Sequence, residues 1–127
     1  MWRGRLSPPP DPYVLVGWAG DGGTVAGFAF GELSPAATAP TGKLQALHVL
    51  PALHGTGAAR ALHDAVLDAF ATWGLDVAQL WVVEGNDRAS AFYTKHGWVF
   101  DGTRGRNDVG GVEVGTERWT RPVRLHG

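Results

Sequence analysis

The stretch HGTGAA, residues 54 to 59, places two glycines between an apolar run and a run with helical periodicity. The first four N–H groups of a helix have no partner inside the helix, and its N-terminus carries about half a positive charge. Such a junction can bind an anion such as a phosphate if no side chain blocks the approach. Gly55 and Gly57 leave it open, and Thr56 and Arg60 could add a hydroxyl and a cation.

A tight turn at the start of a helix is the simpler explanation for a glycine pair on its own. Two common phosphate loops do not fit the stretch. A Walker loop ends in Gly-Lys-Ser/Thr, whereas Gly57 is followed by two alanines. A dinucleotide fingerprint needs a third glycine at the position of Arg60. The choice between a turn and an anion site therefore depends on the rest of the chain.

The composition of the 127-residue chain favours one domain, residues 1–127. It has 11 basic and 12 acidic side chains, so neither nucleic acid nor a membrane surface is expected as a partner. The lack of cysteine excludes a cysteine nucleophile, and the five histidines lack carboxylates at metal-ligand spacing, so we expect no metal. No signal sequence or apolar run of roughly 18 residues is present. We therefore expect a soluble, cytoplasmic protein.

Hydrophobic periodicity predicts an α/β fold with a mixed, mostly antiparallel sheet and two helices, in the order β-β-β-α-β-α-β-β. The expected strands are 13–18, 24–33, 43–50, 77–83, 98–100 and 112–119, the helices are 58–73 and 86 or 87 to 95, and the turns and loops are 21–23, 34–42 and 102–111. Leu62, Val66 and Phe70 fall on one face of the first helix, which we expect to be buried.

A second cluster, NDRASAFYTKHGW at 86 to 98, lies one helix and one strand beyond the glycine loop. Together the two stretches resemble the GCN5-related N-acetyltransferase (GNAT) family. The loop is similar to that family's Q/R-x-x-G-x-G/A pyrophosphate signature, with His54, Gly57 and Ala59 at its defined positions. The cluster is similar to N-x-x-A-x-x-F-Y-x-K-x-G-F through Asn86, Ala89, Phe92, Tyr93, Lys95 and Gly97, with Trp98 in place of the last Phe. The lead-in L-x-x-L-x-V-x-P matches Leu44, Leu47, Val49 and Pro51, and the resemblance covers about residues 13 to 121.

The resemblance implies transfer of an acetyl group from acetyl-CoA to a primary amine of a small molecule or peptide, without a covalent enzyme intermediate. The strand at 43–50 would part from a neighbour and bind the pantetheine arm through its backbone, the loop would hold the pyrophosphate, and Asn86 would contact the arm. The implied cofactor-binding residues are Leu47, His48, Val49, His54, Gly55, Thr56, Gly57, Ala58, Ala59, Arg60, Asn86, Ala89 and Tyr93.

Tyr93 is the expected general acid, because a phenol keeps its proton at neutral pH and can assist a departing thiolate. The general base is open. Many relatives have a glutamate on the strand that here carries Lys43 and Gln45, so Glu32 and His48 are the candidates. Arg104 and Arg106, in the expected loop, could meet an acidic acceptor.

Two other functional classes stay open. One is a non-catalytic acyl-CoA-binding module, because the base is missing. The other is a protein-binding domain with a tryptophan surface, although Trp18, Trp73 and Trp81 fall in patterns typical of a core. Family members usually begin with a strand and two helices, whereas here residues 1–12 form an entry segment that resembles a helix remnant. An uncovered sheet edge would favour a homodimer.

Overall fold

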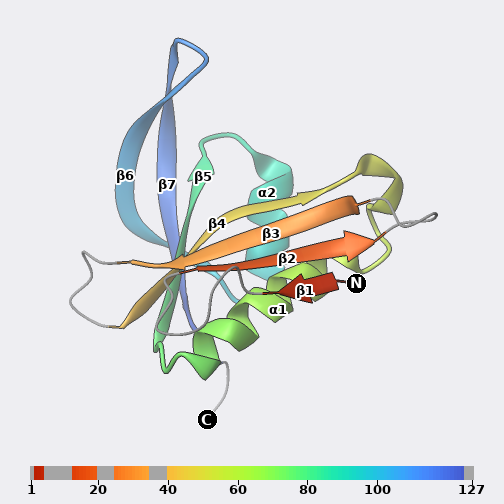
Figure 1. The fold of residues 1–127 in the computed structure, drawn as a ribbon. Coiled ribbons are helices and arrows are strands. Elements are labelled where there is room, and N and C mark those ends of the chain that lie inside the picture. Colours follow the sequence, from red (N-terminus) through yellow and green to blue (C-terminus); the bar gives the residue numbers. More distant parts are fainter. Residues whose placement is uncertain (1, 5–12, 20–24, 35–39, 125–127) are drawn as a thin grey trace.

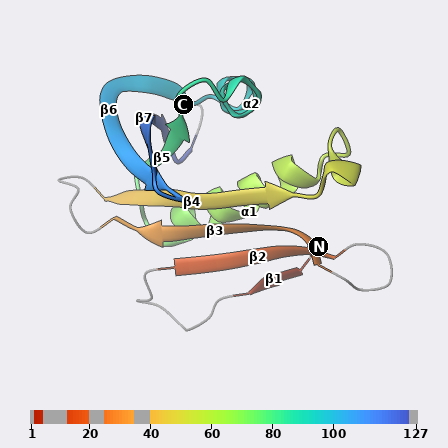
Figure 2. The ribbon, with the colours of Figure 1, turned by 90° about the horizontal axis from the view of Figure 1, so that it is seen from above.

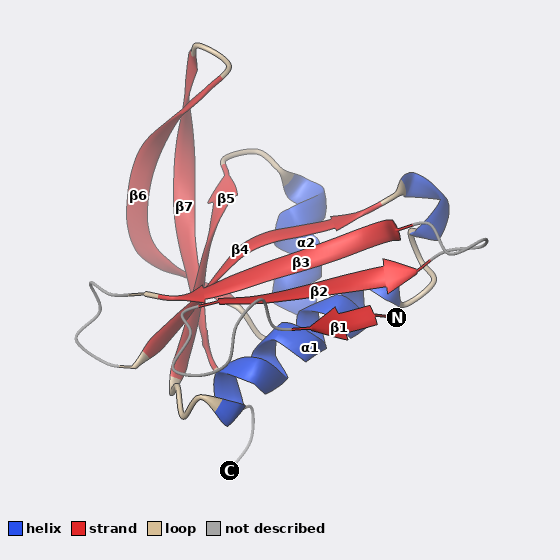
Figure 3. Ribbon diagram, in the orientation of Figure 1, coloured by secondary structure: helices blue, strands red, loops and turns tan. Residues whose placement is uncertain are grey.

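The structure is a computed structural model that describes residues 2–4, 13–19, 25–34 and 40–124. Its strands form one mixed sheet in the order β1-β2-β3-β4-β5-β7-β6, with two α-helices (Figures 1 and 3). The elements are β1 (Trp2–Gly4), β2 (Tyr13–Ala19), β3 (Val25–Leu33), β4 (Thr41–Val49), a 3₁₀ turn (Pro51–Leu53), α1 (Ala58–Thr72), β5 (Val77–Val83), α2 (Asp87–Lys95), β6 (Val99–Val109) and β7 (Val112–Pro122). The predicted fold class is confirmed, as is the predicted element order from β2 onward, and β1 is an additional strand before it. None of the helices in the described ranges is long and apolar enough to cross a bilayer.

The sheet divides between β4 and β5, its one parallel pair within the described residues. These strands pair only through Thr41 with Val77, Gly42 with Ala78 and Lys43 with Gln79. Beyond Lys43 they separate: in Figures 1 and 2, β2–β4 stay side by side while β5, β7 and β6 turn away. The split begins next to a β-bulge in β4. The register with β3 shifts at this point, so Gln45 has no partner residue on β3.

Helix α1 packs closely on β2, β3 and β4, and glycines on the sheet provide the space. A Cβ added to Gly31 would lie 2.6 Å from a Val66 methyl, and one added to Gly42 would lie 2.7 Å from the Phe70 ring. Leu62, Val66 and Phe70 are fully buried, as the periodicity predicts. Side chains alternate between the two faces along a strand. Phe28 and Glu32 follow Gly27 and Gly31, which face α1, so their side chains lie on the opposite face.

The loop predicted over 102–111 is wrong, because β6 and β7 form one long hairpin there. Their pairing runs from Val99 with Thr120 to Val109 with Val112, with an irregularity between Phe100 and Arg104. Its turn consists of Gly110 and Gly111, both with positive φ. Cross-strand ion pairs offset the weak strand preference of the glycines, for example the 2.8 Å contact between Arg106 and Glu113. The pattern of neighbouring residues in the sequence does not predict such cross-strand pairs.

The expected helix remnant in the entry segment is also wrong for its described part. Trp2–Gly4 is a strand that pairs antiparallel with β2, with Trp2 opposite Gly17. The edge of β2 offers unpaired backbone groups, and a short extended segment can satisfy them where one turn of helix could not. Residues 5–12, the predicted turn at 21–23 and residues 35–39 of the predicted loop lie outside the described residues.

A fully buried histidine, which the periodicity does not predict, connects α1 to the start of β6. Trp98 Nε1 donates to His63 Nε2 at 2.9 Å, and His63 Nδ1 lies 2.9 Å from Asp64 Oδ1. Since an indole can only donate, Nε2 must be the unprotonated nitrogen, and Nδ1 donates its proton to the carboxylate. Burial lowers the pKa of His63, although Asp64 opposes the shift. The folded protein therefore holds this histidine neutral.

We predict that Gly42→Ala lowers the free energy of unfolding by about 1 to 3 kcal/mol, because the new methyl group overlaps the Phe70 ring. Phe70→Leu removes part of that ring, so the two substitutions together should cost less than the sum of their separate costs. Urea denaturation of the four proteins in this cycle measures both quantities. Additive costs would show that contact with Phe70 is not the cause.

We also predict that stability declines as the pH falls below about 6.5. In the unfolded chain, His63 binds a proton at the ordinary histidine pKa of 6.5, whereas in the folded protein the pKa of His63 is lowered. The contribution of neutral His63 to the free energy of unfolding is therefore present above about pH 6.5 and is lost as the pH falls toward the lowered pKa. His63→Gln keeps an acceptor for Trp98 and cannot titrate. Its free energy of unfolding should vary less between about pH 7 and about pH 5 than that of the wild type. A residual slope is expected from His96, whose pKa burial also lowers; equal slopes would contradict the assignment.

Candidate functional site

The glycine loop follows the 3₁₀ turn and leads directly into α1. Gly55 has φ 82° and Gly57, the N-cap of α1, has φ 89°. Other residues rarely adopt this left-handed region, which explains why glycine occurs at both positions. Ala58 is fully buried and Ala59 half-buried, so the first turn of α1 adds little bulk at the junction.

Unpaired N–H groups gather at this helix start. At this helix start, the backbone N–H groups of Gly55, Gly57, Ala59 and Arg60 donate no hydrogen bond to any described residue. Ala61 is the first residue whose N–H reaches a carbonyl of the helix, that of Gly57 at 3.0 Å. The Thr56 hydroxyl is used inside the loop, where it donates to the Leu53 carbonyl and accepts weakly from the Ala58 N–H at 3.4 Å. The free N–H groups and the helix dipole make this a site with the chemistry to bind an anion.

His54 connects the glycine loop to α2. Its Nε2 lies 3.3 Å from the Val49 carbonyl, and its Nδ1 contacts the Arg88 guanidinium. Because the guanidinium can only donate, Nδ1 is the acceptor and Nε2 carries the proton. Arg88 therefore adds a fixed positive charge beside the loop. The motifs in the sequence do not point to Arg88, although a basic residue in the first turn of α2 is a signal for a charge near this loop.

The edge of β4 beyond the split faces the loop and α2. Leu50 N–H donates to the Ala26 carbonyl of β3 at 2.9 Å, so the N–H and C=O groups of alternate residues, including His48, also point toward β3. The backbone groups of Leu47 and Val49 consequently point to the side that β5 has left. The backbone groups of Leu47 and the Val49 N–H are therefore unpaired on this side, whereas those of His48 point toward β3 and the Val49 carbonyl is contacted by His54.

Helix α2 supplies the remaining residues expected at the site. The Asn86 side chain caps the helix by accepting from the Ala89 N–H at 3.2 Å, which leaves its amide group as the available donor. Tyr93 and Ala89 of α2 pack against the hydrophobic core to which Leu47 and Val49 of β4 also pack. Burial raises the pKa of Tyr93 to about 12.

The two candidate bases lie on the other face of the sheet. Glu32 accepts a hydrogen bond from the Gln45 side chain, and His48 stacks on Phe28 with ring centroids 5.5 Å apart. Tyr93 packs with the core on the α1 face, whereas both bases occupy the face away from α1. Acid and base candidates therefore lie on opposite faces of the sheet.

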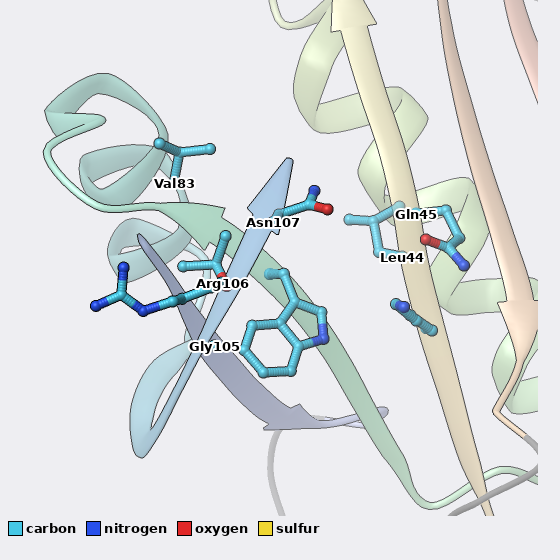
Figure 4. A pocket seen from close by; sticks show the side chains of 9 residues that line it. Leu44, Gln45, Val83, Gly105, Arg106 and Asn107 are labelled. Carbon is cyan, nitrogen blue, oxygen red and sulfur yellow. The ribbon is translucent and has the colours of Figure 1, made fainter. Parts of the chain in front are cut away.

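An open pocket of about 380 Å³, which we name the β4–β5 pocket, lies where the two strands part (Figure 4). Its lining residues are Lys43, Leu44, Gln45, Trp81, Val83, Gly105, Arg106, Asn107 and Thr116. Trp81 is 38% exposed, so its expected place in the core is wrong. Arg104 and Arg106 are both paired, Arg104 with Glu84 at 3.2 Å and Arg106 with Glu113 at 2.8 Å. Figure 4 shows the Arg106 side chain directed away from Leu44 and Gln45.

Solved structures share this architecture. Nourseothricin acetyltransferase superposes with a TM-score of 0.76 and 20% identity, covering 94% of this chain and 71% of that one. The ribosomal-protein-S18-alanine N-acetyltransferase from Escherichia coli gives a TM-score of 0.71 and 22% identity, over 91% of this chain and 72% of that one. At these identities the likeness concerns the fold.

Sequence comparison identifies the family. An uncharacterized N-acetyltransferase of Mycobacterium tuberculosis is 47% identical over 62 residues, which is 49% of this chain and 40% of the relative, so the match spans less than half of that protein. The model of the acetyltransferase (GNAT) family matches residues 2–98, from β1 to the end of α2 and through Trp98. With the glycine loop, the split sheet and α2 all present, this chain belongs to the GNAT acetyltransferase family.

Proposed function

We propose that the chain transfers an acetyl group from acetyl-CoA to a primary amine of a small molecule or peptide by direct attack. The observation that carries the proposal is the set of unpaired backbone donors at the start of α1, which suits the pyrophosphate of coenzyme A. The free edge of β4 at Leu47 and Val49 suits an extended arm that pairs as a strand would. Acetyl-CoA would supply the activated thioester.

Arg88 and His54 strengthen the proposed pyrophosphate site. Arg88 rests against an uncharged His54 nitrogen, so its positive charge is not neutralised by that contact. An anion on the loop would gain a charge-assisted hydrogen bond from a guanidinium that is already beside it. His54, which stands where the signature has Gln or Arg, would then act by holding Arg88 as well as by its own donor.

Tyr93 is the proposed acid, and its environment favours hydrogen-bond donation over complete proton transfer. With a pKa of about 12, Tyr93 is protonated throughout the neutral range. A departing thiolate has a pKa near 8.5, so taking the proton outright from this phenol is unfavourable. A hydrogen bond that strengthens as charge develops on sulfur assists the same step without that cost.

The base remains the open part of the proposal. Glu32 and His48 are the candidates, and each would need a bridging water, because the sheet separates them from Tyr93. The alternative is a non-catalytic acyl-CoA-binding module, which the absence of a carboxylate from β4 favours. Calorimetry with acetyl-CoA, followed by detection of free thiol with a panel of amines, distinguishes them, because a binding module binds without turnover.

A homodimer and a cytoplasmic location are further parts of this proposal. The face of β2–β4 away from α1 exposes Phe28 by 39% and carries the half-buried Leu15 and Phe30, an apolar surface that a second copy could cover. The absence of cysteine suits a reducing compartment.

We predict that Gly57→Glu abolishes measurable acetyl-CoA binding, because it adds bulk and negative charge among the free N–H groups. Gly74→Glu is the matched control: Gly74 also has positive φ, at 79°, and open space around its Cβ position, but it lies at the other end of α1. Both variants carry the same backbone strain and the same added charge. Calorimetry on variants shown by circular dichroism to be folded should find loss of binding in Gly57→Glu alone. Equal affinities would exclude the loop as the cofactor site.

We predict that Tyr93→Phe lowers kcat by about 10²- to 10⁴-fold with little change in cofactor affinity, because it removes a single donor and little volume. The chain contains two tyrosines, so Tyr13→Phe serves as the control and should leave kcat near the wild-type value. Steady-state kinetics with the best amine of the panel gives both numbers. A loss below about threefold would remove Tyr93 from the role.

A further inference from the structure

We infer that the acceptor is a small amine that also carries a carboxylate, and that Lys43 binds this carboxylate in the β4–β5 pocket. The inference rests on the proposed function and names its substrate class. The pocket opens where β4 and β5 separate, and Lys43 is the last β4 residue that still pairs with β5. A molecule bound there would reach the split in which the thioester is proposed to lie.

The β4–β5 pocket contains a positive charge that forms no ion pair with a described residue. Lys43 is half-buried and forms no ion pair or hydrogen bond with any described residue. Glu32 lies opposite Lys43 on β3, and its carboxylate accepts a hydrogen bond from Gln45. An anionic ligand would give the Lys43 ammonium group the charge-assisted hydrogen bond that no described residue provides.

The other lining residues reinforce this preference. No aspartate or glutamate lines the pocket, so nothing there would attract a second positive charge on a ligand. The Arg106 charge is balanced by Glu113 at 2.8 Å, and its side chain points away from Gln45 in Figure 4. Lys43 is therefore the available cation of this pocket within the described residues.

The size and walls of the pocket fit a small molecule. Its volume is about 380 Å³, and the partly exposed indole of Trp81 gives it an apolar wall. Asn107 and Thr116 add neutral hydrogen-bonding groups. A diamine or polyamine would find no counter-charge there and would be repelled by Lys43, so an amino acid or a similar amino-carboxylate is the better match.

The test compares three acceptors of similar length, an amino-carboxylate, its amide and a diamine, in wild type and variants. We expect kcat/KM to favour the amino-carboxylate, and Lys43→Met to lower its kcat/KM by about 10- to 100-fold, the usual effect of a lost charged hydrogen bond. The amide should be unaffected, and Lys43→Arg should retain part of the preference. Arg106→Met is the matched control, because it removes a cation from the same rim whose charge is already paired. Equal use of acid and amide, or an equal loss for both in Lys43→Met, would overturn the inference.

Binding measurements separate failure of this inference from failure of the proposed function. Calorimetry with acetyl-CoA tests the cofactor site, and calorimetry with the same three compounds tests the pocket whether or not turnover occurs. If acetyl-CoA binds and no amine is acetylated, the transfer proposal fails. Selective binding of the amino-carboxylate that is lost in Lys43→Met would still support the pocket assignment, and its absence would overturn it.

Discussion

The separation of β4 from β5 after three paired residues is the constraint on which the rest of this structure depends. A strand inside a sheet normally satisfies its backbone on both sides, and β4 does so only as far as Lys43. Beyond that point its β5 side can be satisfied by water, by His54 at the Val49 carbonyl, or by an extended ligand. The split also places the glycine loop, α2 and the β4–β5 pocket around one gap.

Helix α1 holds β4 in position so that the gap stays open. Glycines at 31 and 42 let Val66 and Phe70 approach the sheet more closely than side chains would allow, which ties α1 to β3 and β4 rather than to β5. The same helix begins with unpaired N–H groups directed at the loop. One element thus fixes the sheet and carries the proposed anion site, so damage to its packing should also impair binding.

The parts of the fold set by local periodicity could be predicted from sequence. The spacing of Leu62, Val66 and Phe70 predicts α1, and Asn86 with Gly97 bounds α2. The glycine loop was recognisable because glycine is the residue type that readily adopts positive φ, as Gly55 and Gly57 do.

What depends on contacts between distant segments could not be predicted. The β6–β7 hairpin requires ion pairs across strands, such as Arg106 with Glu113, which give no signal in a window of neighbouring residues. The buried His63 ring nitrogen is satisfied by Trp98, a donor 35 residues away in the sequence. Arg88 is relevant because it contacts His54, and Lys43 because it has no ion-pair partner among the described residues. Such pairing arises only in the folded chain.

The bulge at Gln45 shifts the alternation of side chains between the two faces of β4 by one residue. Before it, Gly42 and Leu44 face α1; after it, Leu47 and Val49 do, while His48 turns outward to Phe28. If Gln45 were instead accommodated in an unbroken pleat, the faces of everything downstream would exchange: Leu47 and Val49 would turn to solvent and His48 into the core. Deleting Gln45 would remove the bulge and leave Leu47 and Val49 facing α1. For this strand, the number of residues therefore matters as much as the identity of their side chains.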